Sequence, residues 1–447
     1  MLGNSPSAQQ TATMTSHRSE AAAHARDMTP DGASRRELFR IPQAESGPYP
    51  QVAYLAGNSL GLQPRATREE LLEDLDAWAN LAVHGHVEST RPWLPYHREL
   101  SEPTARLVGA LPSEVVVMNS LTVNLHLLMA SFYRPTSQRH HILVEDHCFS
   151  SDSYAVRSHA AFRGYDPDTA ILRLRPRPGE DTLRTEDVVA LLQAEGPSIA
   201  MVLLGGVNYL TGELMDIPTI TAAGHEQGAM IGWDLAHAAG NVPLRLHDWN
   251  VDFAAWCSYK YLNSGPGSLA GAFIHERHVT DPTTPRLEGW WSTREEVRFA
   301  MAAVSDPPPT ADAWATSNPP IFAMGPVRTS LAIFDEVGID ALRARSLSLS
   351  DYLWSLLEPI QSTGAITIVT PREHRDRGTQ VSIRVRADAA ELTDRMRLNW
   401  GVVADERKPD IIRLAPAALY CTYHDCWRAA DALAQELLGT SITEVNP

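Results

Sequence analysis

From about residue 113 onward, short apolar runs alternate with amphipathic stretches of helical length. The apolar runs that have the length of strands are 115–118, 142–145, 171–174, 199–204, 229–233, 252–256 and 270–274. The stretches with the length and spacing of helices are 120–132, 184–195 and 217–227. Several runs lack polar alternation, which is typical of strands buried on both faces. The pattern predicts an α/β fold with a mainly parallel central sheet, whose strands are joined by crossover helices.

Proline-rich segments interrupt this alternation after residue 280 and are typical of loops. Beyond them, the sequence predicts helices at 326–345, near 389–397 and at 426–438, and strands at 367–370 and 379–385. These elements indicate a smaller α+β domain that begins near residue 325. Residues 1–30 are rich in Ser, Ala, Thr and Gln and contain no apolar run, so we expect a mostly disordered tail there.

Composition and charge mainly exclude classes of function. The 447 residues include 38 basic and 54 acidic side chains, and the formal net charge of −16 repels polyanions such as nucleic acids. Every apolar run is far shorter than the roughly 20 residues that a membrane-spanning helix needs. The four cysteines show neither a CxxC pair nor regular spacing, so we predict no metal site and no disulfide framework, and a cytoplasmic location fits best. We expect no nucleic-acid or membrane partner.

Lysine occurs at only two positions, Lys260 and Lys408. Lys260 follows the predicted strand 252–256 and precedes a loop rich in Gly and Pro, and Asp234 directly follows the predicted strand 229–233. Because ligand sites in open α/β sheets lie at the carboxyl ends of strands, we expect both side chains to face one crevice. The alternatives are a solvated surface lysine and an aspartate that caps a helix.

A carboxylate and a lysine at neighbouring strand ends suit pyridoxal phosphate chemistry. The lysine amine bonds covalently to the cofactor aldehyde, and the acid keeps the pyridine nitrogen protonated so that the ring withdraws electrons. The phosphate needs backbone N–H groups and hydroxyls at the start of a helix. The run MNSLTVNLHLLM at 118–129 offers both, although a simple N-cap by Ser120 or Thr122 fits the same run.

Long blocks of this sequence resemble the kynureninase family, which consists of pyridoxal phosphate enzymes of the fold-type-I aminotransferase superfamily. The blocks are YLAGNSLGLQP at 54–64, WDLAHAAGNVPL at 233–244 and HDWNVDFAAWCSYKYLNSGPGSLAGAFIHERH at 247–278. The resemblance implies an N-terminal segment at 31–60 that packs with the small domain, a large cofactor-binding domain at 61–324 and a small α+β domain at 325–447. Enzymes of this fold generally form dimers with the active site at the subunit boundary, so we expect a homodimer.

The resemblance also implies roles for single residues. Lys260 holds the cofactor covalently, Asp234 pairs with the pyridine nitrogen and His237 lies beside the cofactor. The further cofactor-binding residues that it implies are Leu121, Thr122, Phe149, Asp152, Tyr259, Trp290 and Asn318. Gly205 stands where similar proteins carry a serine near the cofactor, a departure that puts this contact in question. Without the resemblance, Phe149 would be interpreted as a core residue and Asp152 as a helix cap.

For the substrate, the resemblance makes Arg413 the residue that binds the α-carboxylate, a group that a guanidinium holds through two parallel hydrogen bonds. His86, Ser317 and Asn318 lie at positions where kynureninases that favour the ring-hydroxylated substrate carry a histidine and an asparagine, and such polar groups discriminate against a ligand that lacks the hydroxyl. Structural roles in turns explain these residues equally well.

The activity implied is hydrolytic Cβ–Cγ cleavage of kynurenine-type substrates, preferably 3-hydroxykynurenine or another ring-substituted relative, which yields a (3-hydroxy)anthranilate and L-alanine. We expect Tyr259 to transfer a proton in this reaction.

Two other interpretations stay open from the sequence. A different fold-type-I reaction, such as that of an aminotransferase or a cysteine desulfurase, would use the same cofactor. Cys421 and Cys426 follow Arg413 closely enough to supply the reactive cysteine of a desulfurase. A catalytically silent homologue that keeps the cofactor as structure is disfavoured, because Lys260, Asp234 and Arg413 are all present.

Overall fold

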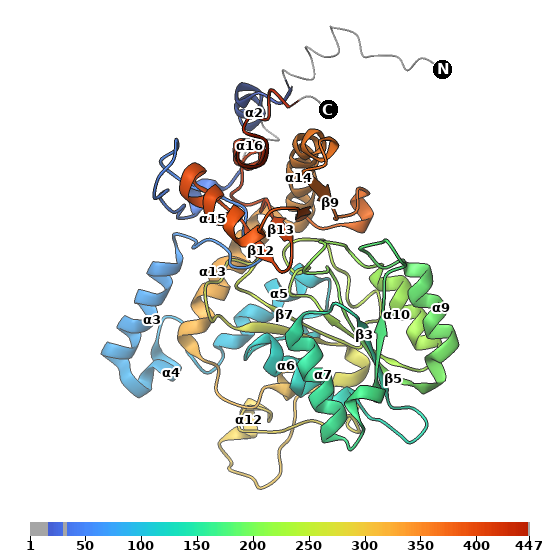
Figure 1. The fold of residues 1–447 in the computed structure, drawn as a ribbon. Coiled ribbons are helices and arrows are strands. Elements are labelled where there is room, and N and C mark those ends of the chain that lie inside the picture. The colour runs from blue at the N-terminus through green and yellow to red at the C-terminus, as the bar shows by residue number, and fades with distance from the viewer. Residues whose placement is uncertain (1–16, 30–33, 446–447) are drawn as a thin grey trace. The chain divides into compact units, whose positions relative to one another are not determined.

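The computed structural model describes residues 17–29 and 34–445, and the chain divides into two compact units (Figure 1). The larger unit consists of residues 64–209 and 213–339. The smaller unit consists of the described residues up to 63, the short segment 210–212 and the residues from 340 onward.

A seven-stranded sheet forms the centre of the larger unit, in the order β2-β8-β7-β6-β5-β3-β4. Its strands are β2 (Val115–Met118), β3 (His141–Glu145), β4 (Ile171–Leu174), β5 (Ile199–Gly205), β6 (Met230–Asp234), β7 (Phe253–Cys257) and β8 (Ala270–Ile274). Neighbours from β7 to β4 are parallel, whereas β8 is antiparallel to both β2 and β7. The predicted mainly parallel α/β fold is confirmed. Strand β8 is the exception because the connection 258–269 contains no crossover helix.

The helices of the larger unit are α3 (Thr67–Leu81), α4 (Gly85–Glu88), α5 (Ser101–Val108), α6 (Leu121–Phe132), α7 (Ser150–Phe162), α8 (Pro167–Ala170), α9 (Thr185–Glu195), α10 (Ile217–Glu226), α11 (Glu276–Val279), α12 (Glu295–Arg298) and α13 (Ile321–Val337). Helix α6 packs beside α7, and α9 packs beside α10 (Figure 1). The chain leaves β3 toward β4 but leaves β5 toward β6, so right-handed connections place these two helix pairs on opposite faces of the sheet. The carboxyl ends of β3 and β5 therefore form a topological switch point, where α/β folds bind their ligands.

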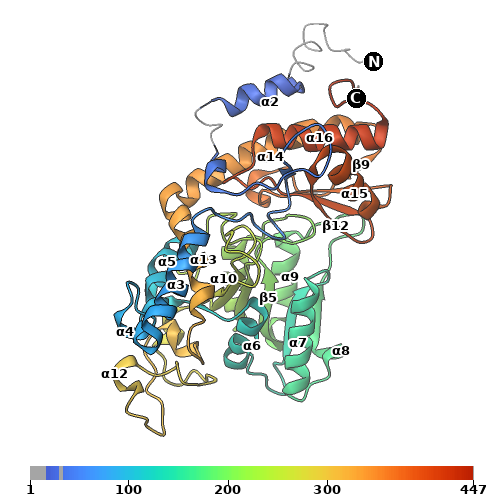
Figure 2. The same cartoon turned by 90° about the vertical axis from the view of Figure 1, so that its left-hand side faces the viewer.

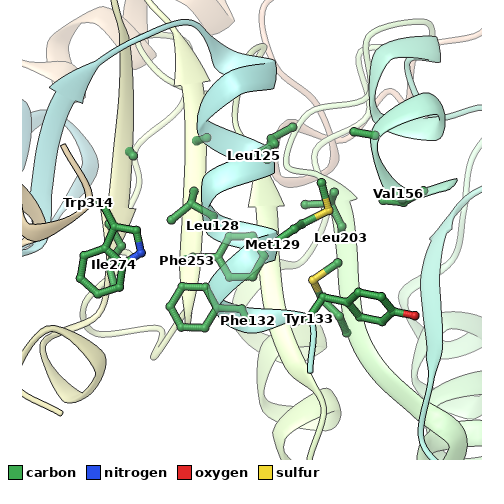
Figure 3. Packing of buried hydrophobic residues seen from close by; sticks show 14 of the residues in the cluster. Leu125, Leu128, Met129, Phe132, Tyr133, Val156, Leu203, Phe253, Ile274 and Trp314 are labelled. Carbon is green, nitrogen blue, oxygen red and sulfur yellow. The ribbon is translucent and has the colours of Figure 1, made fainter. Parts of the chain in front are cut away.

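The core between α6 and the sheet is built from stacked aromatic rings (Figure 3). The ring of Phe132 lies parallel to that of Phe253, with centroids 5.0 Å apart, and also stacks on Trp314. Gly232 on β6 permits this arrangement, because a Cβ atom there would lie 2.1 Å from the Phe253 ring. Close packing of this kind fixes the strand ends that carry the site.

The smaller unit has a four-stranded antiparallel sheet in the order β12-β13-β10-β9 and a two-stranded parallel sheet of β1 and β11. Its elements are α2 (Glu20–Asp27), β1 (Ala53–Tyr54), α14 (Ile339–Ser362), β9 (Ile366–Ile368), β10 (Val381–Val385), α15 (Ala389–Trp400), β11 (Val402–Val403), β12 (Asp405–Arg407), β13 (Ile411–Leu414) and α16 (Tyr423–Leu438). Helix α16 begins with a capping box between Thr422 and Asp425 and ends at Gly439, whose φ of 70° favours glycine. Figure 2 shows α14 and α16 from the side.

Three sequence expectations differ from the structure. The expected tail at 1–30 lies partly outside the described residues, at 1–16 and 30, but residues 20–27 form α2. The Asp27 carboxylate accepts the backbone N–H groups of Tyr423 and His424, and this tertiary contact anchors a helix that has only Ala23 buried and therefore shows no hydrophobic pattern. The predicted helix 326–345 is divided between α13 and α14 by Gly338, whose φ is 80°.

The third difference concerns the boundary near residue 325, which falls within α13. This helix packs against α3 and α5, so it belongs to the larger unit. In the described part of the chain, no helix is long and apolar enough to cross a membrane.

Candidate active site

A cavity in the larger unit lies at the carboxyl edge of the sheet, and it is lined by the start of α6 and by residues at or after the ends of β3, β5, β6 and β7. It brings together nine of the residues singled out in the sequence: Leu121, Thr122, Phe149, Asp152, Gly205, Asp234, His237, Tyr259 and Lys260. These residues are up to 139 positions apart in the chain (Leu121 to Lys260), so only the fold makes them neighbours.

Lys260 is the one lysine or arginine among the described residues that line the cavity. Its Nζ lies 3.0 Å from Nε2 of His237 and 5.7 Å from the centroid of the Phe149 ring. Asp234, at the end of β6, is buried, and its Oδ1 accepts the backbone N–H of Ala236 at 2.7 Å. One amine, one imidazole and one carboxylate thus face a common space.

The start of α6 offers a site for an anion. Asn119 turns the chain with a φ of 49°, and the N-cap residue Ser120 makes no side-chain hydrogen bond to the helix. The first N–H groups of this 12-residue helix therefore lack a capping side chain. The hydroxyls of Thr122 and Ser151 lie 2.7 Å apart beside them. Backbone donors, two hydroxyls and the helix dipole are the groups that bind a phosphate.

Three buried carboxyl groups also line the cavity, namely Glu145, Asp152 and Asp234. Burial raises the pKa of Asp152 well above its usual range, and the neighbouring Asp234 raises it further. Burial likewise raises the pKa of Glu145. A positively charged group in the cavity would relieve this crowding, as a protonated pyridine nitrogen does.

Tyr259 precedes the lysine and lines the same cavity. Burial raises the pKa of its phenol, and contact with the Cys257 thiol raises it further. The phenol is therefore protonated at neutral pH and is able to donate a proton.

The residues of this cavity fit pyridoxal phosphate. The start of α6 with Thr122 and Ser151 would hold the phosphate, Phe149 would lie against the ring, Asp234 would face the pyridine nitrogen and Lys260 would bond to the aldehyde. The donor set supports this fit, because one cavity holds hydroxyl and backbone donors for a phosphate, carboxyl groups for a pyridine nitrogen and a single lysine amine.

Five of the predicted residues do not line this cavity, and four of them lie in the larger unit. Trp290 and Asn318 lie on two loops that touch through a hydrogen bond from Trp291 N to Thr316 O, at 3.3 Å. Ser317 and Asn318 are exposed, and Trp290 packs edge-on against Phe299. His86 lies on α4, edge-on to the Trp93 ring at 5.3 Å.

Arg413 lies in the smaller unit on β13, where it is 1% exposed. It stands directly across from Asp405 on β12, and its Nε donates to Asp405 Oδ1 at 2.7 Å while its Nη2 donates to Oδ2. This paired carboxylate orients the guanidinium.

Glu145, Ser151 and Asn208 also line the cavity, and they are not among the residues predicted from the sequence. Glu145 had a recognisable signal, because it is a charged residue that ends the apolar run ILVE. Ser151 and Asn208 had none, since polar residues of their kind are common in loops and at helix starts.

Known proteins are similar to this chain over most of its length. Residues 342–433 match the family model described as the kynureninase C-terminal domain. The kynureninase of Salinispora tropica is 67% identical over 400 residues, which cover 89% of this chain and 93% of that protein. The kynureninase of Koribacter versatilis is 53% identical over 393 residues, with coverage of 88% and 92%.

The fold is similar to solved structures of other enzymes. A cysteine desulfurase from Thermococcus onnurineus NA1 aligns with a TM-score of 0.69 and 16% identity, covering 87% of this chain and 95% of that one. A cystine C–S lyase aligns with a TM-score of 0.70 and 15% identity, covering 89% and 98%. At such low identity these structures show the fold-type-I architecture alone. Identity of 67% across nearly the whole chain shows more: the chain belongs to the kynureninase family, whose members are pyridoxal phosphate-dependent hydrolases of carbon–carbon bonds.

Proposed function

We propose that this protein hydrolyses the Cβ–Cγ bond of L-kynurenine-type substrates, prefers 3-hydroxykynurenine or another ring-substituted kynurenine, and releases the corresponding anthranilate and L-alanine. The observation that carries the proposal is the cavity that joins Lys260, Asp234 and the anion-binding start of α6. When bound there, pyridoxal phosphate supplies an electron-withdrawing ring that stabilises negative charge on the substrate.

Each cavity residue then has a defined task. Lys260 holds the cofactor and, once displaced by the substrate amine, removes the α-proton at its Nζ, with His237 3.0 Å away to share that proton. Tyr259 is a protonated phenol and supplies a proton at the substrate carbonyl or Cβ. Arg413, already oriented by Asp405, binds the α-carboxylate.

Trapping of the cofactor tests this assignment directly. Borohydride reduction of the holoenzyme followed by peptide mass mapping should place the reduced adduct on Lys260. An adduct on Lys408, or none in protein supplied with ample cofactor, would contradict the proposal.

The ring preference rests on His86 and Asn318, whose imidazole and amide are able to hydrogen-bond an aromatic hydroxyl. Steady-state kinetics with kynurenine, 3-hydroxykynurenine and a ring-methylated analogue test it. We expect His86→Leu and Asn318→Ala to lower kcat/KM for the hydroxylated substrate by about tenfold or more and to change that for kynurenine little. Faster turnover of unsubstituted kynurenine by the unaltered enzyme would refute the preference.

We also propose a homodimer in which Trp290 and Asn318 reach the cofactor of the second copy. Large apolar side chains support this, because Trp78, Phe299 and Met301 are 58%, 64% and 74% exposed within one chain. Mixing the inactive variants Lys260→Ala and Trp290→Ala should restore activity through mixed dimers with one intact site. Monomers in light scattering, or no recovery on mixing, would argue against this arrangement.

A desulfurase is the weaker candidate. Cys421 and Cys426 are fully buried, and burial raises the pKa of both thiols, so neither resembles a reactive loop cysteine.

The cysteines of the chain are all free thiols, which supports a reducing, cytoplasmic location.

A further inference from the structure

The side chain of Glu145 links the carboxyl ends of β3 and β5, which form the switch point of the sheet. Glu145 ends β3 and is 4% exposed. Its Oε1 accepts the backbone N–H of Gly205, the last residue of β5, at 2.8 Å. Its Oε2 accepts Nδ2 of Asn208, in the loop that follows β5, at 2.6 Å. Both oxygens of this carboxyl group are therefore bound to N–H donors that lie at one wall of the cofactor cavity.

The glycine at position 205 makes this close approach possible. A Cβ atom at Gly205 would lie 3.0 Å from Glu145 Oε1, so a side chain there would require the carboxyl group to move slightly. Glycine at position 205 therefore leaves room for the Glu145 carboxyl group to approach the backbone.

The hydrogen bonds also indicate where the protons of the acidic cluster are. Burial raises the pKa of Glu145, but the N–H donor on each of its two oxygens opposes this effect and favours the charged form. Asp152 is different, because it is hydrogen-bonded to Asp234, whose oxygen is able to accept a proton from it. Lys260 and His147 also interact with this cluster and favour the charged carboxylates. The Cys148 and Cys257 thiols and the Tyr259 phenol are further titratable groups that interact with it.

We propose that Glu145 is a positioning residue of the cofactor site: as a carboxylate anchored by Gly205 and Asn208, it keeps one proton on the Asp152–Asp234 pair. Its fixed negative charge repels a second charge on that pair, so Asp152 stays neutral and orients Asp234 toward the pyridine nitrogen. This inference rests on the cofactor site described above and adds a residue that does not touch the reacting atoms.

The variant Glu145→Gln is nearly isosteric, but it removes the charge and places an NH2 group against Gly205 N–H or the Asn208 amide. We expect the dissociation constant for pyridoxal phosphate, measured by equilibrium dialysis, to rise about tenfold. We expect the pH midpoint of the visible absorbance of the bound cofactor to fall by about one unit, because the lost charge of Glu145 is only partly replaced when Asp152 ionises in its absence. The double variant Glu145→Gln/Asn208→Asp restores both the hydrogen-bond polarity and the charge, and should recover most of both effects.

Glu114→Gln is the matched control. Glu114 is also fully buried and accepts the backbone N–H groups of Leu111 and Glu276, but it does not line the cavity. We expect this variant to lower the melting temperature of the apoprotein without moving the absorbance midpoint. If Glu145→Gln behaves in the same way, or if the double variant recovers neither effect, the proposal is overturned.

Should Glu145→Gln not fold, Asn208→Leu provides a second test. It removes one of the two anchors and should weaken cofactor binding in the same dialysis assay, whereas unchanged affinity would overturn the proposal. Adduct mapping at Lys260 in the unaltered protein is independent of these results, so failure of this inference is distinguishable from failure of the cofactor site.

Discussion

Buried carboxyl groups have opposite surroundings at the two ends of the strands of the central sheet, its amino edge and its carboxyl edge. At the amino edge, Asp252 precedes β7 and is surrounded by donors: it accepts Ile231 N–H at 2.7 Å, His225 Nε2 at 2.8 Å and His278 Nε2 at 2.7 Å, and it pairs with Arg277 at 2.5 Å. At the carboxyl edge, Asp152 and Asp234 face each other, and no arginine lies among the described residues of that cavity.

Electrostatics follows from this difference in partners. Burial alone would raise the pKa of Asp252, but the histidines and Arg277 outweigh burial and lower it far below its usual value. Burial and Asp234 together raise the pKa of Asp152. A satisfied carboxylate stabilises the fold, whereas crowded carboxyl groups cost stability until a cationic ligand binds.

The largest effect should come from the carboxyl edge. Asp234→Ala removes the acid that we propose pairs with the pyridine nitrogen, so we expect kcat to fall about a thousandfold. The melting temperature of the apoprotein should stay the same or rise, because one of three crowded carboxyl groups is lost. Steady-state kinetics and thermal melting check both parts; a kcat within tenfold of the unaltered enzyme would contradict the assigned role.

The equivalent change at the amino edge should affect stability instead. Asp252→Ala leaves Arg277 and two histidines without their acceptor, and we expect a loss of about 3 kcal/mol in the free energy of unfolding. Chemical denaturation of the apoprotein measures it. The kcat of the folded, cofactor-loaded variant should stay within about twofold, as expected for a residue outside the cavity. A large loss of kcat would show that the two edges are not independent.

The pH dependence of these edges should have opposite signs. The folded pKa of Asp252 is depressed, so its stabilisation is complete above the unfolded pKa and is lost as the pH falls through that value toward the folded one. The folded pKa of Asp152 is raised, so its ionisation lowers stability as the pH rises above the unfolded pKa. We expect Asp152→Asn to raise the apoprotein melting temperature at pH 8 by about 4 °C and by less at pH 5. Equal gains at both pH values would rule out this explanation.

The smallest effect concerns a third carboxyl group, Asp74 on α3. Burial raises its pKa to about 6, although Asp74 does not line the cavity. We expect Asp74→Asn to stabilise the protein by about 1 kcal/mol at pH 8, to have no effect at pH 4 and to leave kcat unchanged. A loss of kcat would show that Asp74 contributes to activity although it lies outside the cavity.

Much of the larger unit is predictable because its strands are marked by local runs of apolar residues. The run 199–204 is apolar throughout, and β5 is buried over those residues because helices cover both faces of the sheet. Helix α3 carried no such signal. Thr67 and Asp74 are its buried residues, while Leu72, Leu75 and Trp78 are 44%, 43% and 58% exposed, so its apolar positions do not mark an inner face.

The sequence by itself determined the order of strands and helices along the chain and the family resemblance, and it singled out Lys260 and Asp234, since residue identity and local periodicity suffice for these. Only the tertiary structure decided that Glu145 binds Gly205 and Asn208, that Asp152 meets Asp234 and that β8 runs against its neighbours. Each of these depends on contacts between segments far apart in the chain, and the pKa of a buried carboxyl group is set by such neighbours rather than by its own sequence context.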